Sequence, residues 1–187
     1  MLIGFAYTGS FCTIAKSINV MRSLIEKGIE ILPIMSENAY QTDTRFGKAI
    51  AIRNVITEMC QREIIHTIVE AEPLGPKTKL DALVISPCTG NTLSKIANGI
   101  TDTPVCMAAK AHLRNNSPLV IALATNDALS ANLKNIATLL SRKNVYFTPM
   151  IQDDPFNKPY SLVADFDLIE VTLENARQGK QINKIFI

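Results

Sequence analysis

The 187-residue chain is 47% hydrophobic and 19% charged, with 19 basic and 17 acidic residues and a formal net charge of +2. No cluster of Lys and Arg marks a nucleic-acid surface, and no apolar run approaches the ~20 residues that span a bilayer. The four cysteines form no Cys-x-x-Cys pair and only two histidines accompany them, which argues against a metal site.

The first half of the chain alternates short apolar segments with amphipathic ones. We expect strands over residues 2–7, 29–35 and 64–69, and helices over residues 13–27 and 47–61. In the first helix Ile14, Ile18, Met21 and Ile25 recur at helical spacing, and Gly28 follows as a C′ glycine. The chain begins directly with a strand rather than a signal peptide, so we expect a cytoplasmic protein.

The second half continues this alternation. We expect strands over residues 83–85, 119–124 and 145–147, and helices over residues 93–98, 105–114 and 129–142. Asp127 is expected to cap the last of these helices. Strands separated by helices of this length predict an α/β fold: a doubly wound parallel sheet of about six strands with helices on both faces.

The last part of the chain, residues 151–187, does not continue the alternation of strands and helices. We expect a single domain, residues 1–187, in which residues 1–150 form the core and residues 151–187 a loop and a C-terminal helix. The helix is predicted over residues 161–178, with Ser161 as its N-cap and Gly179 as its stop. Its apolar face either packs back on its own domain or meets another subunit.

The segment Ser86-Pro87-Cys88-Thr89-Gly90-Asn91-Thr92 closes a buried strand and opens a helix. A helix N-terminus presents unpaired N–H groups and partial positive charge, which suit an anionic or carbonyl-rich ligand. Turn chemistry alone also favours Pro, Gly, Asn and Thr at such places. The segment therefore indicates a ligand site without establishing one.

Four turns rich in hydroxyls and amides follow the predicted strands, at residues 8–10, 36–38, 86–92 and 125–127. Open parallel sheets bind ligands at the edge where such turns meet. Thr8-Gly9-Ser10 can hold a phosphate on backbone N–H groups and a hydroxyl, yet it is neither a P-loop nor a dinucleotide fingerprint. We therefore favour a mononucleotide with one phosphate over ATP or NAD.

The histidines and two of the cysteines are candidates for chemistry. His66, in an apolar segment, is either a half-buried structural residue or the better of two proton-transfer candidates. His112 is expected at the surface. Cys12 and Cys88 each lie in a strand-to-helix turn, where a helix N-terminus can lower a thiol pKa.

Three of these motifs together resemble the flavoprotein family of FMN-binding cysteine decarboxylases. They are Thr8-Gly9-Ser10, the segment from Pro87 to Ile100, and Asn126 ahead of Asn135-Ile136. The resemblance covers roughly the first 150 residues. It implies a Rossmann-like fold, bound FMN and a trimer-based homo-oligomer.

The resemblance also implies roles for individual residues. Gly9, Ser10 and Ser36 would hold the FMN phosphate, while Thr89 and Asn91 would approach the flavin. Asn126 would lie near the ring or the substrate and is the first catalytic candidate, ahead of His66. The other implied cofactor-binding residues are Phe11, Asn38, Ser86, Thr92, Met107 and Ala108.

Residues 74–81 and 158–166 resemble more closely one branch of this family. Its members oxidise a cyclic dihydropyridine dicarboxylate beside an NAD(P)-binding partner subunit, in the mother cell of spore-forming bacteria. Lys77 and Arg45 are then candidates for binding the substrate carboxylates, with Lys79 as another.

The chain departs from the decarboxylase pattern, because Pro73 stands near the position of the family's catalytic histidine. Decarboxylation of a peptidyl cysteine is therefore disfavoured, whereas the phosphate turns are intact. The alternative to a catalytic role is a structural or activating subunit with a vestigial flavin pocket.

Overall fold

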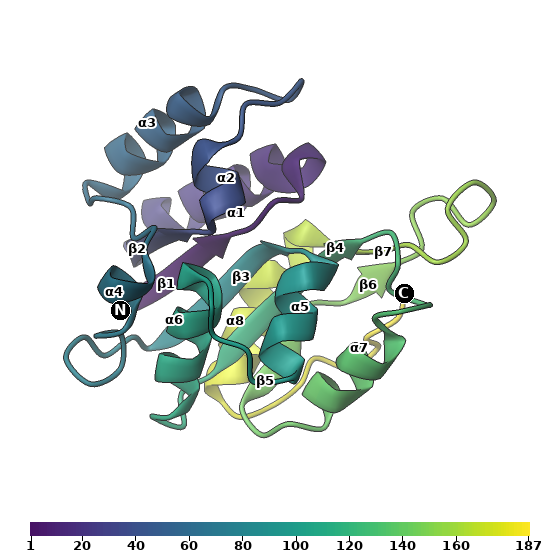
Figure 1. The fold of residues 1–187 in the computed structure, drawn as a ribbon. Coiled ribbons are helices and arrows are strands. Elements are labelled where there is room, and N and C mark those ends of the chain that lie inside the picture. The colour runs from purple at the N-terminus through teal and green to yellow at the C-terminus, as the bar shows by residue number, and fades with distance from the viewer.

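The computed structural model describes residues 1–187 as a seven-stranded sheet with helices on both faces (Figure 1). The strands lie in the order β2-β1-β3-β4-β7-β6, and β5 also pairs with β4. Their bounds are β1 Leu2–Tyr7, β2 Glu30–Met35, β3 Ala82–Cys88, β4 Leu119–Thr125, β5 Val145–Phe147, β6 Met150–Ile151 and β7 Leu162–Ala164. The predicted α/β class is confirmed.

The helices form two layers, with α1, α3 and α8 on one face of the sheet and α4 to α7 on the other. Their bounds are α1 Ile14–Glu26, α2 Glu37–Gln41, α3 Ala49–Cys60, α4 Ile68–Ala71, α5 Gly90–Ala97, α6 Pro104–Leu113, α7 Leu133–Leu140 and α8 Ile169–Arg177, with 3-10 helices η1 Phe11–Thr13 and η2 Phe166–Leu168. Two apolar cores result, of 21 and 24 buried residues, one on each side of the sheet. No helix is both long and apolar enough to cross a membrane.

The five strands β2, β1, β3, β4 and β5 are parallel to one another. All seven residues of β3 are buried, as expected for a strand covered by helices on both faces. Because these strands run in one direction, the turns that follow β1 to β4 meet at one edge of the sheet. This edge carries the polar motifs that the sequence pattern singled out.

The end of α1 shows how local sequence sets these boundaries. Gly28 adopts a φ of +79°, which an L side chain rarely tolerates. Its N–H donates to the Ile25 carbonyl, and the Ile29 N–H donates to the Leu24 carbonyl. This is the Schellman arrangement, and it confirms the predicted stop.

The prediction of a strand over residues 64–69 is wrong. Ile65 forms only an isolated bridge to Ile34. Thr67 and Glu70 then make a capping box that starts the short helix α4. The local cap overrides the β-branched composition of this segment.

The C-terminal segment is also organised differently from the prediction. Ser161 does not cap a helix: residues 162–164 form β7, which pairs antiparallel with both β4 and β6, and α8 begins only at Ile169. Ile169, Leu173 and Ala176 are buried against the sheet. The apolar face of α8 therefore packs on its own chain rather than on another subunit.

His112 is buried rather than at the surface, with 1% of its area exposed. Its Nε2–H donates to the Pro118 carbonyl at 2.9 Å. Burial lowers the pKa of this imidazole, and the Pro118 carbonyl opposes that shift only in part. His112 is thus a structural residue of α6.

Candidate functional site

Two adjoining cavities open at the edge where the parallel strands end. The helix cavity, of about 600 Å³, lies between the N-termini of α2 and α5. The loop cavity, of about 440 Å³, lies over the end of β4 and the loop between β6 and β7. Both volumes suit a small-molecule site. Gly9, Phe11 and Thr89 line both cavities, so the two lie side by side.

The helix cavity is lined by capped helix starts. The Ser36 hydroxyl accepts a hydrogen bond from the Ala39 N–H, and the Thr89 hydroxyl accepts one from the Thr92 N–H. The first N–H groups of a helix have no partner within it, so α2 and α5 direct free backbone donors toward the space. Asn38 and Asn91 add amide groups to the lining.

The charged side chains of the helix cavity, one cation and two carboxylates, sum to a net charge of −1. Lys95 is its only cation, and its ammonium lies 2.8 Å from an Asp102 carboxylate oxygen. Glu37 adds a further carboxylate. An anionic group here would therefore be held chiefly by neutral donors, namely hydroxyls and backbone N–H groups.

Thr8 joins the first turn to α5. Its hydroxyl donates to the Pro87 carbonyl at 2.7 Å and accepts from the Thr89 N–H at 2.9 Å. Gly9, the next residue, leaves space: a Cβ built on it would meet nothing closer than the Phe11 ring at 3.7 Å. The hydrogen bonds of Thr8 thus fix the turn on the side of the sheet, and at Gly9 the turn is open toward the cavities.

A polar network supports the turn after β4. Asp127 does not cap a helix at residue 128, because α7 begins only at Leu133. Its carboxylate instead accepts hydrogen bonds from the Thr125 hydroxyl and from the Asn132 amide. Asn126 stands between Thr125 and Asp127 in the sequence. Its side chain is exposed and lines the loop cavity.

The structure brings most of the predicted site residues together. The sequence-based candidates that line one or both cavities are Gly9, Ser10, Phe11, Ser36, Asn38, Thr89, Asn91, Thr92 and Asn126. They come from the turns after β1, β2, β3 and β4. The expected convergence of these turns at one sheet edge is confirmed.

Three predicted cofactor-binding residues lie away from both cavities. Ser86 is fully buried, and its hydroxyl lies 2.8 Å from that of Ser17 on α1. Ala108 is buried in the core, and Met107 packs against the same core from α6. Within one chain these side chains serve packing.

The other catalytic and carboxylate candidates are also placed elsewhere. The His66 ring stacks on Tyr40, with centroids 3.9 Å apart, and lines neither cavity. Lys77 lies in the loop that enters β3, at the opposite end of that strand. Arg45 lines neither cavity. Its guanidinium lies 4.8 Å from the centroid of the Phe46 ring, which lines the loop cavity.

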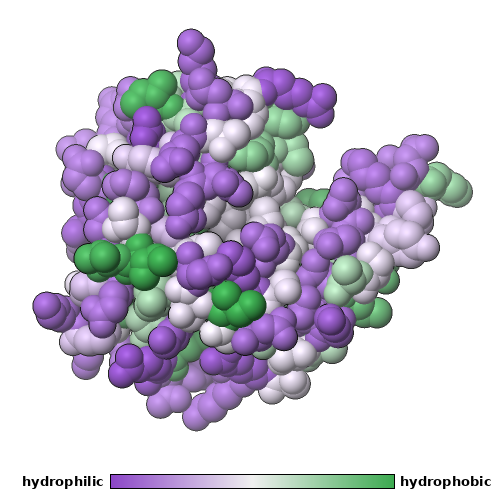
Figure 2. Space-filling view, viewed as in Figure 1, coloured by the Kyte–Doolittle hydropathy of each residue, from purple (hydrophilic) through white to green (hydrophobic).

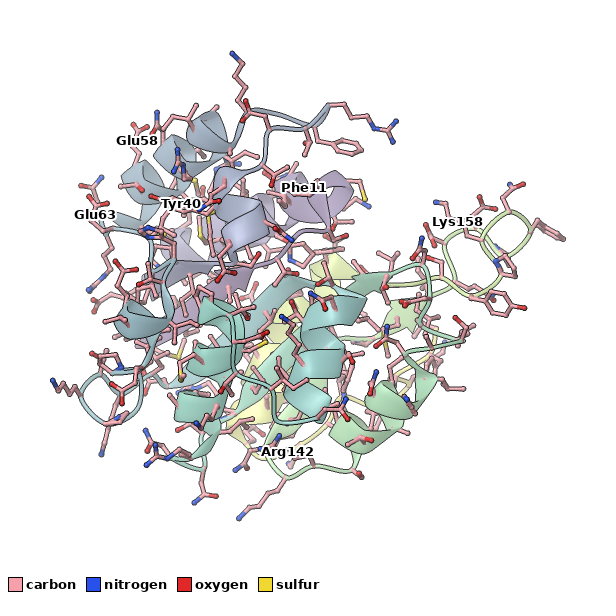
Figure 3. The ribbon with its side chains drawn as sticks, viewed as in Figure 1. Phe11, Tyr40, Glu58, Glu63, Arg142 and Lys158 are labelled. Atoms are coloured by element: carbon pink, nitrogen blue, oxygen red, sulfur yellow. The ribbon has the colours of Figure 1, made fainter.

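The structure adds residues that the sequence pattern did not place at the site. Asp153, Lys158 and Ser161 line the loop cavity, contributed by the loop between β6 and β7. This loop projects from the body of the molecule, with a notch between them (Figures 1 and 2), and Lys158 stands on it (Figure 3). Pairing of β7 with β4 brings the loop there, which local sequence does not reveal.

The two thiols near the site, those of Cys88 and Cys12, differ in burial. Cys88 is fully buried, and burial raises the pKa of its thiol well above the ordinary value, so it is not the reactive residue that its position suggested. Cys12 is exposed and lines the loop cavity.

Comparison with known proteins places this chain in a family. The flavoprotein family model matches residues 1–167. The B subunit of dipicolinate synthase from Bacillus subtilis (strain 168) is 46% identical over 185 residues, covering 99% of this chain and 92% of that protein. A crystal structure of the dipicolinate synthase B subunit from Bacillus halodurans C superposes with a TM-score of 0.91 at 44% identity, covering 100% of this chain and 95% of the other.

A more distant structure shares the fold. A dodecameric FMN-dependent UbiX-like decarboxylase from Escherichia coli O157:H7 superposes with a TM-score of 0.66 at 23% identity, covering 80% of each chain.

Proposed function

The chain belongs to the flavoprotein family, and we propose that it is the FMN-binding B subunit of a dipicolinate synthase. In this role it helps to oxidise dihydrodipicolinate to dipicolinate (pyridine-2,6-dicarboxylate) together with a nicotinamide-binding A subunit. The near full-length identity to the Bacillus subtilis protein carries the proposal. The setting would be the cytoplasm of the mother cell during sporulation, with the chain in a trimer-based homo-oligomer.

The donor set of the helix cavity fits a mononucleotide phosphate. The open turn at Gly9 and the capped start of α2 at Ser36 supply neutral donors to the helix cavity, and the Ser10 hydroxyl lines the adjoining loop cavity. The only cation there is already paired with Asp102, which suits one phosphate better than a triphosphate. Gly9, Ser10 and Ser36 would therefore hold the phosphate of FMN.

The two neighbouring cavities offer space for the rest of the cofactor. Thr89 and Asn91, at the start of α5, would meet the polar edge of the flavin ring, and Asn126 would face it from the loop cavity. When bound, FMN supplies a hydride acceptor for oxidation.

The loop cavity would hold the substrate. Converting a dihydropyridine to a pyridine removes a hydride equivalent and a proton, so the ring must be oriented rather than activated by a nucleophile. The Asn126 amide would orient it by hydrogen bonding, and the Thr125 and Ser161 hydroxyls, which donate to Asp127 and Asp153, can accept hydrogen bonds from it. These residues would position the substrate and exclude bulk water from it.

One observation favours a second candidate function. The only ionisable side chains lining the loop cavity are Cys12, Asp153 and Lys158, and no histidine is among them. A subunit with so few groups for proton transfer could instead be a structural or activating partner of the A subunit, with a vestigial flavin pocket.

The visible absorption spectrum of the purified chain tests the proposal, followed by chromatography of any released chromophore. We expect a flavin band and released FMN. A colourless chain that also fails to bind added FMN would favour the structural role. Mixing with the A subunit, with and without flavin, then shows whether oxidation of dihydrodipicolinate depends on the flavin of this chain.

A further inference from the structure

Lys158 is the one cation that lines the loop cavity. Its ammonium lies 3.4 Å from an Asp153 carboxylate oxygen, and the two side chains are 54% and 32% exposed. Asp153 is the one carboxylate among the lining residues, and no other Lys or Arg lines the cavity. An anionic ligand entering this cavity therefore finds a single positive charge.

The backbone holds Lys158 at the cavity. The Lys158 N–H donates to the Asp154 carbonyl at 2.8 Å, and the Ser161 N–H donates to the Lys158 carbonyl at 3.0 Å. The Tyr160 carbonyl accepts from the Leu129 N–H at 2.9 Å. This last bond ties the loop to the turn that carries Asn126, so the lysine and the asparagine belong to one connected wall.

We propose that Lys158 binds a carboxylate of the substrate in the loop cavity, and that the substrate carboxylate displaces Asp153 from it. The identity of the substrate as a dihydropyridine dicarboxylate rests on the proposed function. Lys158 thereby replaces Lys77, which lies at the opposite end of β3, as the carboxylate-binding residue of this chain.

The exchange of one carboxylate for another costs little. Ion pairs between exposed side chains contribute little to stability, so Lys158 can leave Asp153 readily. Partial burial acts to raise the pKa of Asp153, but the Ser161 hydroxyl and the Lys158 ammonium outweigh it, so the pKa is lowered. Asp153 is therefore ionised at neutral pH and competes with the ligand for the lysine.

Calorimetric titration of the full chain with pyridine-2,6-dicarboxylate tests this. We expect Lys158→Met to bind the dicarboxylate about tenfold more weakly, and Lys158→Arg to retain most of the affinity, because a charge-assisted hydrogen bond is lost only in the first. Asp153→Asn should bind severalfold more tightly, since its amide oxygen still accepts from Ser161 while the competing charge is gone. Lys134→Met, at an exposed position of α7, is the matched control and should bind like the unmodified chain.

The same samples separate this inference from the proposed function. Flavin content and FMN affinity should not change in any of the four variants. Unaltered dicarboxylate affinity in Lys158→Met, or no binding by the unmodified chain, overturns the inference even if FMN is bound. A colourless chain that also fails to bind added FMN refutes the flavin proposal, yet weaker dicarboxylate binding by Lys158→Met would still support the lysine site.

Discussion

The Thr8 hydroxyl accepts a hydrogen bond from the Thr89 amide at 2.9 Å and so joins two motifs that lie 81 residues apart in the sequence. Thr8 is 1% exposed and also donates to the Pro87 carbonyl. The turn after β1 and the start of α5 are therefore held together by protein atoms before any ligand binds. Hydrogen bonds of this kind, made by a buried residue behind a site, keep the groups that line the site in place.

Thr8→Val should weaken both the fold and the site. The substitution keeps the shape of the side chain but leaves the partly buried Thr89 N–H without its partner, which costs about 1–2 kcal/mol of the free energy of unfolding. FMN affinity should fall as well, because Thr89 lines both cavities. Urea unfolding and FMN titration measure the two effects. Thr8→Ser retains the hydroxyl and is the control; equal stability of the two variants would contradict the expectation.

Gly90→Ala should destabilise the chain by about 1–3 kcal/mol, as overpacking does in a filled interior. Its Cβ would lie 2.5 Å from the Asn132 amide nitrogen and 2.7 Å from the Thr125 hydroxyl. Asn132 is 5% exposed and hydrogen-bonded to Asp127, so it cannot move aside freely. The absence of a side chain at residue 90 is thus a packing requirement of the Asp127 network.

Gly9→Ala is the matched comparison for Gly90→Ala. Its Cβ would meet only ordinary contacts, the nearest at 3.7 Å, so we expect the urea midpoint to change little. The added methyl group would stand beside Phe11 and Asn38 in the helix cavity, so FMN binding should weaken. Equal loss of stability in the two alanine variants would contradict this reading of the two glycines.

Asn126→Ala should reduce the rate of dihydrodipicolinate oxidation by about 10²-fold, the usual loss when one orienting hydrogen-bond donor is removed. The side chain is exposed, so stability should not change. Asn54→Ala, at an exposed position of α3, is the control and should retain full activity. Steady-state kinetics of the two-subunit mixture checks this. Unchanged turnover in Asn126→Ala would favour the structural role of this chain.

Native thiol labelling should modify Cys12 first. It is the exposed cysteine, whereas Cys88 and Cys106 are buried. Burial raises the pKa of Cys60 to about 11, so that thiol stays protonated and slow at neutral pH and gains reactivity only as the pH approaches this value. Mass spectrometry after brief treatment with iodoacetamide should show one adduct, absent from Cys12→Ser. Bound ligand in the loop cavity should slow the reaction.

His112 should make stability depend on pH. Because burial lowers its folded pKa below the ordinary 6.5, the unfolded chain binds this proton more readily than the native chain does. Its contribution is therefore complete above that ordinary pKa and is lost as the pH falls through the folded pKa. Urea unfolding at about pH 7.5 and about pH 5.5 measures the loss. His112→Gln, which can still donate to Pro118, should show a smaller difference; an equal one would contradict the assignment.

Local sequence determined the central architecture of this protein. Gly28 ends α1 through a backbone conformation that glycine adopts easily, and Thr89 starts α5 through its own hydroxyl. Both signals act within a few residues, so the alternation of strands and helices could be predicted from the chain alone. Parallel strands in that order necessarily place the turns after β1 to β4 at one edge. The convergence of Ser36, Asn91 and Asn126 followed from this.

Tertiary pairing decided the rest. Residues 162–164 are a strand only because they pair with β4 and β6, and this pairing brings Lys158 into the loop cavity. His112 is buried because α6 packs it against the segment that enters β4, where the Pro118 carbonyl satisfies its ring nitrogen. Short strands and buried polar groups depend on partners far away in the sequence, and no local pattern encodes those partners.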